Sequence, residues 1–285
     1  MGLGIRSTPN AHAMGCTEVS KSEHETCAVP LWPGCTHLAH TCKIPDANPI
    51  EIGRGSMERN LGNMFSEYGQ DEWLLRKVFT AIPWASEGFF VEFGARDGKE
   101  HSNSYFFEHV LRWNGILVEP VDTEFSKLIS NRPNSYCLHG ALCSHSEKRT
   151  FLSFDGELAG WSGFEKNLID KGHMEHVKNV VRTGRSKMIE TTVQCHNINE
   201  ELLKLGVDHV QLFSADCEGC EKEVLESLDW ENISVDVFLI ERSLRENEII
   251  SFLLPKGYVL VNLDSSDLIF VSAKIMQYVE AKYFG

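Results

Sequence analysis

The stretch FFVEFGARDG at residues 89–98 constrains the fold of this chain more than any other feature. Its apolar start predicts a buried strand, and Gly94 and Gly98 predict a tight turn in which the backbone comes close to a ligand. A second apolar strand, at residues 115–118, ends in Glu119, which stands 21 residues after Gly98. A glycine-rich turn after one strand and an acid after the next is typical of nucleoside binding in α/β folds, because the acid accepts hydrogen bonds from the ribose hydroxyls.

Two nucleoside ligands fit this pattern, a dinucleotide and S-adenosylmethionine. The dinucleotide fingerprint needs a third glycine before a helix that receives the pyrophosphate, and residues 94–98 contain only two glycines. Glu92 and Asp97 would repel a pyrophosphate, whereas carboxylates suit a sulfonium cation and an ammonium group. Electrostatics therefore favours S-adenosylmethionine, and an NAD-dependent oxidoreductase stays as an alternative.

Several further motifs accompany this stretch in a fixed order. They are YGQD at 68–71, HSNS at 101–104, WNGILVEP at 113–120, NRP at 131–133, SADCEGCE at 214–221 and FLIE at 238–241. With VEFGARDG, they make residues 66–272 resemble the FkbM-type methyltransferase family. The resemblance implies a class I S-adenosylmethionine-dependent fold and, as is usual in the family, O-methylation of a hydroxyl. We expect that hydroxyl to belong to a small molecule or a glycan.

The alternation of strand-like and helix-like segments from residue 66 onwards predicts a Rossmann-like α/β fold. We expect a mostly parallel seven-stranded sheet with an antiparallel last strand, flanked by helices, in a domain that spans residues 66–285. Residues 145–190 break the alternation and predict an insertion at the carboxyl edge of the sheet, where substrates of open α/β sheets bind. Residues 1–60 hold five of the nine prolines and no periodicity, so we expect a poorly ordered extension.

Two acids are the strongest candidates for binding the cofactor. Glu92 ends an otherwise apolar strand, where an unpaired acid is costly to bury. We therefore interpret Glu92 as holding the amino end of the methionine moiety, directly or through water. Glu119 fits a bidentate acceptor for the two ribose hydroxyls, and Pro120 would stiffen the loop beneath the adenine. The alternative for both acids is a solvated position at a strand end.

The turn and its flanking segments complete the predicted cofactor site. Asp97 would accept hydrogen bonds from the ligand or from loop amides, or cap the following helix. By resemblance Gln70 and Asp71 approach the cofactor, although Asp71 would also complement the dipole of its own helix. Asn103 would bind the cofactor or cap a helix. The remaining predicted contacts come from Gly94, Ala95 and Gly98.

Asp216 and Glu218 follow a strand predicted at residues 210–215, where methyltransferases of this class place a catalytic group. Methyl transfer is an in-line displacement, so the enzyme must align the acceptor oxygen and remove its proton. Either acid could be the base, or both could hold a divalent cation with Glu241. Glu218 could instead complement a helix dipole. We predict Asp216 and Glu218 as catalytic residues and no metal.

The composition excludes several classes of partner. A net charge of −14 without a Lys/Arg cluster argues against nucleic acid. No apolar run reaches the ~18 residues of a membrane span. The nine dispersed cysteines indicate reduced thiols and a cytoplasmic protein, with Cys217 and Cys220 as packing residues. A non-catalytic relative that acts in protein interaction or trafficking is a further alternative, which the intact cofactor residues disfavour.

Overall fold

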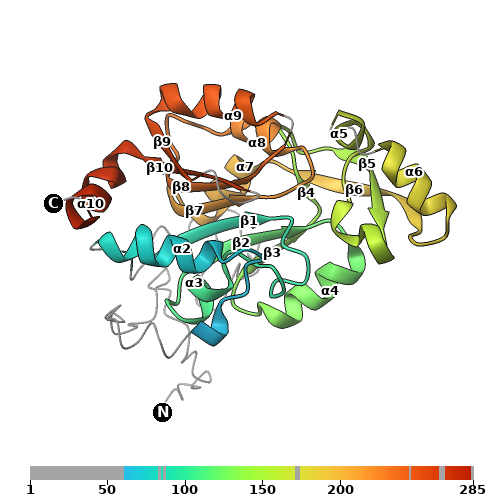
Figure 1. The fold of residues 1–285 in the computed structure, drawn as a ribbon, viewed down its shortest axis with the longest axis horizontal. Coiled ribbons are helices and arrows are strands. Elements are labelled where there is room, and N and C mark those ends of the chain that lie inside the picture. Colours follow the sequence, from blue (N-terminus) through green and yellow to red (C-terminus); the bar gives the residue numbers. More distant parts are fainter. Residues whose placement is uncertain are drawn as a thin grey trace, which may run out of the picture. The chain divides into compact units, whose positions relative to one another are not determined.

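The computed structural model describes residues 61–82, 85, 88–170, 174–243, 245–262 and 267–283, so the extension predicted at 1–60 lies outside the described residues. A central sheet runs in the order β3 (Tyr136–His139), β2 (Asn114–Glu119), β1 (Phe89–Phe93), β7 (His209–Ala215), β8 (Ser234–Glu241), β10 (Asp267–Ser272) and β9 (Tyr258–Asn262) (Figure 1). The strands from β3 to β8 are parallel, whereas β10 is antiparallel to both of its neighbours. This topology confirms the predicted α/β class and its mostly parallel seven-stranded sheet.

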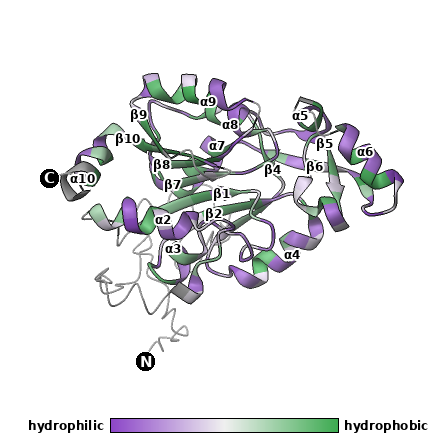
Figure 2. Cartoon of the chain, viewed as in Figure 1, coloured by the Kyte–Doolittle hydropathy of each residue, from purple (hydrophilic) through white to green (hydrophobic). Residues whose placement is uncertain are grey.

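The central strands are buried on both faces, which explains their nearly continuous apolar sequences. All five residues of β1 are buried. Phe90 lies beside Leu212 of β7, and the next residue, Val91, lies beside Phe213 on the opposite face. Figure 2 shows the same pattern, with hydrophobic strands at the centre and hydrophilic positions along the helices.

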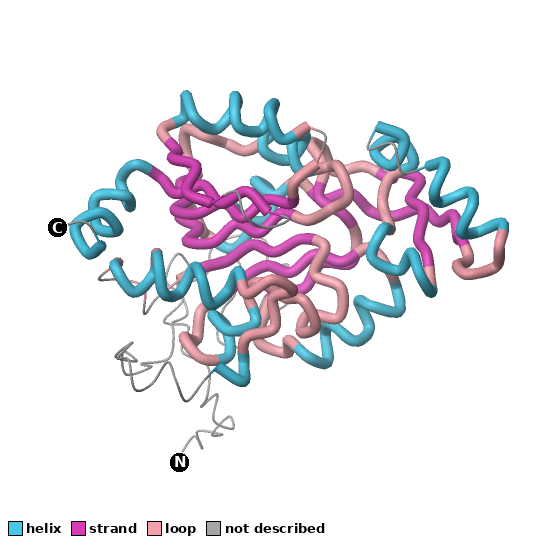
Figure 3. Tube along the Cα trace, viewed as in Figure 1, coloured by secondary structure: helices cyan, strands magenta, loops and turns pink. Residues whose placement is uncertain are grey.

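Helices flank these strands, as the tube in Figure 3 shows. Leu74 of α2 (Gln70–Lys77), Phe106 of α3 (Tyr105–His109) and Ile275 of α10 (Ala273–Tyr283) belong to one apolar cluster with Phe90. The sequence did not predict α10, although Ile275 and Val279 have the spacing of a helical stripe. The remaining α-helices of the central fold are α4 (Asp122–Asn131), α7 (Ile198–Leu205), α8 (Glu221–Ser227) and α9 (Glu246–Leu253).

The predicted insertion forms a second, smaller sheet. β6 (Met188–His196) pairs with β5 (Lys148–Phe154) and with β4 (Ala141–Leu142). Between β5 and β6 lie the 3-10 helix η3 (Gly156–Trp161) and the helices α5 (Glu165–Asp170) and α6 (Met174–Arg182). These elements lie together at one end of the central sheet in Figure 1, around an apolar cluster of their own.

Two disulfides correct the expectation of reduced thiols. Cys143 is bonded to Cys195 of β6, and Cys217 is bonded to Cys220. The first pair is separated by 52 residues in the sequence, yet its Cα atoms lie 5.5 Å apart, a distance typical of disulfides. Cys137 is a free thiol. The interpretation of Cys217 and Cys220 as packing residues is wrong, because the two form a disulfide. Their spacing in the sequence does not reveal the turn that brings the two sulfur atoms together.

The described part of the chain also bears on membrane association. Every helix there falls short of the length and apolarity that a bilayer crossing requires.

Candidate functional site

Two adjoining pockets lie at the carboxyl ends of β1, β2 and β7. The first, here the Glu119 pocket, is lined among others by Glu119, Pro120, Leu142, Phe151 and Phe164. The second, the Glu92 pocket, is lined among others by Gln70, Glu92, Asn103, Trp161 and Ser214. Both pockets share the lining residues Phe93, Gly94, Arg96, Gly160, Asp216 and Glu218. They therefore form one cleft, in the position where open α/β sheets bind ligands.

The turn after β1 needs glycine at two places. Gly94 has φ +75°, and a Cβ built on it would lie 1.7 Å from the Asp216 carbonyl oxygen. Gly98 has φ +74°, and a Cβ there would lie 2.3 Å from Leu128 Cδ1 and 2.8 Å from Arg132 Cγ. A left-handed backbone and close contacts exclude larger residues at both positions. The ends of β1 and β7 meet at Gly94, which brings the predicted turn and Asp216 together.

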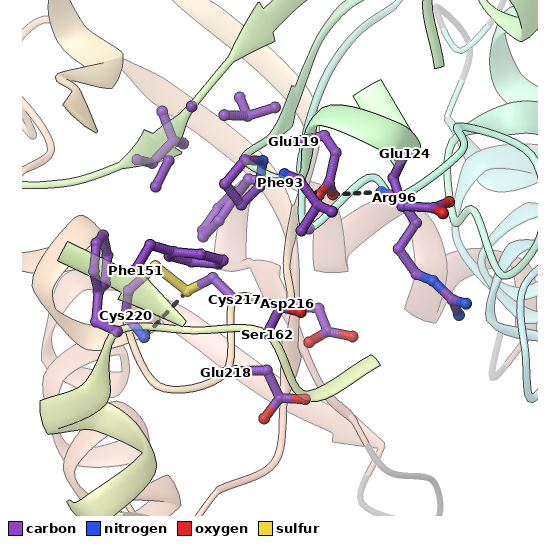
Figure 4. Close-up of a pocket in the computed structure, with 18 of the residues that line it drawn as sticks. Phe93, Arg96, Glu119, Glu124, Phe151, Ser162, Asp216, Cys217, Glu218 and Cys220 are labelled. Atoms are coloured by element: carbon purple, nitrogen blue, oxygen red, sulfur yellow. Dashed lines mark hydrogen bonds between the residues drawn. A yellow bond between two sulfur atoms is a disulfide. The ribbon is translucent and has the colours of Figure 1, made fainter. Parts of the chain in front are cut away.

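Glu119 lies at the end of β2 and is only 3% exposed. Its Oε2 accepts a hydrogen bond from the Arg96 N–H at 2.8 Å (Figure 4). Its Oε1 accepts one from the Val121 N–H at 2.8 Å. Burial raises the pKa of this carboxyl to about 7, against a usual value of 4.5. A carboxylate offers about four acceptor positions, so two hydrogen bonds leave capacity for further donors from the pocket.

Glu92 shapes the loop that follows the turn. Its Oε1 accepts from the Asn103 N–H at 2.8 Å, and its Oε2 accepts from the hydroxyls of Ser102, at 2.9 Å, and Ser104. The side chain is 4% exposed and lines the Glu92 pocket. The structure therefore gives Glu92 a set of protein donors, in addition to the ligand contact predicted from the sequence.

Asn103 carries a buried hydrogen-bond acceptor next to the cleft. Its Nδ2 donates to Ser214 Oγ at 3.1 Å, which fixes the orientation of the amide. Its Oδ1 is buried and has no hydrogen-bond partner among the described residues. A buried acceptor of this kind is unfavourable until a ligand or a water molecule donates to it. The side chain lines the Glu92 pocket, so a donor held there would satisfy it.

Of the remaining predicted cofactor residues, some line the cleft and others do not. Gln70, Gly94, Ala95 and Pro120 line the cleft, as do the residues described above. Gln70 also donates through Nε2 to Asp267, a neighbour 197 residues away in the sequence.

Three predicted residues do not line the two pockets. The Asp71 carboxylate accepts from the N–H groups of Phe65, at 2.9 Å, and Ser66, at 3.3 Å. Asp97 accepts from the N–H groups of Lys99 and Glu100, so it caps the loop after the turn. Gly98 packs against Leu128 and Arg132 rather than against the cleft. Both acids therefore accept hydrogen bonds from backbone N–H groups of neighbouring loop residues, and their contact with a cofactor stays a prediction.

Asp216 and Glu218 stand where the two pockets meet, in the loop between β7 and α8 (Figure 4). The Cys217–Cys220 disulfide closes this loop, and Glu218 has a left-handed backbone with φ +58°. A non-glycine residue in this region is strained and is often part of a functional site. Oxygen atoms of Asp216, Glu218 and Glu241 lie within 4.8 Å of one another. This arrangement can bind a proton or a cation.

Sequence reasoning missed several residues of the cleft. Arg96 and Gly160 line both pockets. Arg96 lies inside the glycine turn, where its position alone could have indicated a role. Ser214 is the first residue of the SADCEGCE motif and orients Asn103 from a strand 111 residues away, which local patterns do not reveal.

The chain is similar to one protein family and to several solved structures. The sequence profile of the methyltransferase FkbM domain matches residues 92–260. No curated protein matches the chain. Similar solved structures include TrmK of M. capricolum in complex with S-adenosyl-homocysteine, with 9% identity and a TM-score of 0.33, covering 73% of this chain and 67% of that one. They also include a fibrillarin/Nop5p complex, with 13% identity and a TM-score of 0.31, covering 65% of this chain and 71% of that one. Since the domain profile covers more than half of the sequence, the chain belongs to the FkbM methyltransferase family, as its motifs predict.

Proposed function

We propose that this protein transfers a methyl group from S-adenosylmethionine to a hydroxyl oxygen of a small molecule or a glycan. The observation that carries the proposal is the continuity of the cleft. Glu119, the proposed acceptor for the ribose hydroxyls, lines one pocket of the cleft, and Asn103, whose buried Oδ1 has no hydrogen-bond partner among the described residues, lines the other. Asp216 and Glu218 line both pockets.

The residues present fit S-adenosylmethionine. Glu119 retains acceptor capacity for ribose hydroxyls, and Pro120 and Leu142 supply apolar lining in the same pocket. The Glu92 pocket holds more carboxylates than cations, and negative charge suits a ligand with an ammonium and a sulfonium group. Asn103 Oδ1 has no hydrogen-bond partner among the described residues, and the ammonium group of the ligand would supply one.

The chemistry follows from the acids at the junction of the pockets. When bound, S-adenosylmethionine supplies a methyl group activated by a positively charged sulfur. A hydroxyl is a weak nucleophile, so a carboxylate of this chain must accept its proton as the new carbon–oxygen bond forms. Asp216 and Glu218 line both pockets and are therefore the proposed proton acceptors.

Calorimetric titration tests the proposal. The full-length protein is titrated with S-adenosylhomocysteine and S-adenosylmethionine, with NAD as the control, and then assayed with labelled methyl donor against a panel of hydroxylated small molecules and glycans. We expect binding of both adenosyl ligands, no binding of NAD, and transfer to an acceptor oxygen. Binding without transfer to any acceptor would support a non-catalytic relative, whereas binding of NAD alone would contradict the proposed cofactor.

Replacing Asp216 by Asn should lower the rate of methyl transfer by about 100-fold or more, because general-base catalysis contributes on this scale. The affinity for S-adenosylhomocysteine should change by less than about threefold, since the substitution keeps the shape of the side chain. The measurement is kcat of Asp216→Asn and of Glu218→Gln, with the acceptor that the transfer assay identifies. Glu226→Gln is the matched control, because Glu226 lies on α8, pairs with Lys222 and does not line the cleft. Loss of activity on chelation would instead favour a cation held with Glu241.

The affinity for S-adenosylhomocysteine should rise with pH through about pH 7. The pKa of Glu119 is raised to about 7 by burial, and the ionised form is the better acceptor for ribose hydroxyls. Below pH 7 the ligand must displace a proton, which weakens binding by up to about tenfold per pH unit. Titrations at about pH 6, pH 7 and pH 8 check this, and a flat profile would contradict it.

The ligand-free protein should show the opposite trend. The folded-state pKa of Glu119 lies above its usual value of 4.5, so its contribution to stability is fully present below 4.5 and is lost as the pH rises through about 7. Thermal melting with and without ligand separates the two effects, because the increase in melting temperature on binding should grow with pH.

The cytoplasmic location expected from the sequence stays a prediction. Because disulfides are typical of oxidising compartments, Cys143–Cys195 and Cys217–Cys220 weigh against it.

A further inference from the structure

Arg132 lies at the centre of a buried polar network beside the glycine turn. It follows α4 directly, is fully buried, and its guanidinium packs over the Phe90 ring, with Cζ 5.2 Å from the ring centroid. Its Nη1 donates to the Gly98 carbonyl oxygen at 2.9 Å, and its Nε donates to Glu108 Oε2 at 2.5 Å. Arg132 lines neither pocket of the cleft, so it can influence a ligand there only through the residues that it holds in place.

The guanidinium fixes the loop that carries Asn103. Nη1 donates to Ser102 Oγ at 3.2 Å and Nη2 donates to Ser104 Oγ at 2.9 Å, so Arg132 holds the residues on both sides of Asn103. The same two hydroxyls donate to Glu92, whose other oxygen accepts from the Asn103 N–H. Asn103 is therefore held by its backbone, by both neighbours and, through Nδ2, by Ser214.

The charges of this network suit a cationic ligand. The partners of the Arg132 guanidinium are the buried acids Glu108 and Glu92, the latter with Oε2 4.0 Å from Nη1. Two carboxylates and one guanidinium leave one net negative charge when both acids are ionised. Buried ion pairs contribute little net stability, which favours a geometric role for the arginine.

We propose that Arg132 is a positioning residue for the amino-acid end of the methyl donor. It acts through Glu92, Ser102 and Ser104 to hold Asn103, whose Oδ1 accepts a hydrogen bond from the donor's ammonium group. The inference rests on the proposed function, since it concerns the orientation of S-adenosylmethionine in the same cleft. Arg132 itself makes no contact with the ligand.

Two ligands that differ only at the amino-acid end test this role. S-adenosylhomocysteine carries the amino acid, whereas 5′-methylthioadenosine keeps the adenosine and the thioether without it. Arg132→Lys keeps the charge but not the planar set of donors. We expect it to weaken S-adenosylhomocysteine by roughly tenfold or more, the scale of one charge-assisted hydrogen bond. The affinity for 5′-methylthioadenosine should stay within about twofold.

Asn103→Ala keeps the test decisive if Arg132→Lys does not fold, because Asn103 is less buried than Arg132 and its truncation removes no charge from the core. It should show the same selective loss. The matched control is Arg149→Lys, since Arg149 also pairs with a glutamate, Glu223, and lines neither pocket of the cleft. It should leave both affinities unchanged.

The outcomes separate this inference from the proposed function. A wild-type protein that binds neither ligand would overturn both. The role of Arg132 and Asn103 alone would be overturned if the wild-type protein binds both ligands and each variant either loses affinity for both ligands equally or loses affinity for neither.

Discussion

Replacing Glu119 by Ala should weaken the binding of S-adenosylhomocysteine by about 100-fold or more. The carboxylate is the acceptor proposed for two ribose hydroxyls, and hydrogen bonds to a charged group contribute about 1.5–3 kcal/mol each. Losing two such bonds costs roughly 3 kcal/mol or more, which corresponds to about two orders of magnitude in affinity. The measurement is calorimetric titration of the variant beside the wild-type protein.

Asp122→Ala is the matched control for Glu119→Ala. It removes the same charge three positions further along the chain, but its side chain is 84% exposed and pairs with His139 outside the cleft. We expect its affinity to match that of the wild-type protein within about twofold. Equal binding by Glu119→Ala and the wild-type protein would show that the ribose site lies elsewhere.

Replacing Gly94 by Ala should both destabilise the protein and abolish cofactor binding. The new Cβ would lie 1.7 Å from the Asp216 carbonyl oxygen, and the backbone would keep a left-handed φ of +75°. Either β1 and β7 separate at their ends or the turn changes its conformation. Strain of this kind costs roughly 3 kcal/mol or more. For a domain of this size that lowers the melting temperature by roughly 10 °C.

Gly160→Ala is the matched control for Gly94→Ala. Gly160 lines the same two pockets, but a Cβ built on it meets nothing within 4 Å in the described part of the chain. Its melting temperature should stay within about 2 °C of the wild type. Thermal melting followed by titration with S-adenosylhomocysteine compares the two variants. A Gly94→Ala protein that melts and binds like the wild type would contradict the close approach of the turn to Asp216.

Local patterns predicted most of the fold. The buried run 89–93, the run ending in Glu119 and the run before Asp216 became β1, β2 and β7, because a strand buried on both faces reads as a continuous apolar segment. The small sheet of β4, β5 and β6 was harder to predict as a unit, because β4 has only two residues and pairs with a strand more than 50 residues away.

The candidate site was predictable where one residue's role follows from its place on a strand. Glu119 is the last residue of β2 and Glu92 the penultimate residue of the neighbouring parallel strand β1, so both lie near the same edge of the sheet. For Asp71 and Asp97, the place in the sequence did not distinguish a structural role from contact with a ligand. Their carboxylates accept from nearby backbone N–H groups, and only the loop conformation decides between an amide and a ligand.

The sequence by itself determined the family motifs, the individual strands of the sheet and the acids that follow them, since each depends on residues close together in the chain. The tertiary structure alone decided the disulfides, the orientation of Asn103 by Ser214 and the network around Arg132. Apart from the Cys217–Cys220 disulfide, whose cysteines are three residues apart, these contacts join segments separated by 24 to 111 residues. Hydrogen bonds and disulfides require approach within a few ångströms, and such proximity arises only when the packed sheet and helices bring distant segments together.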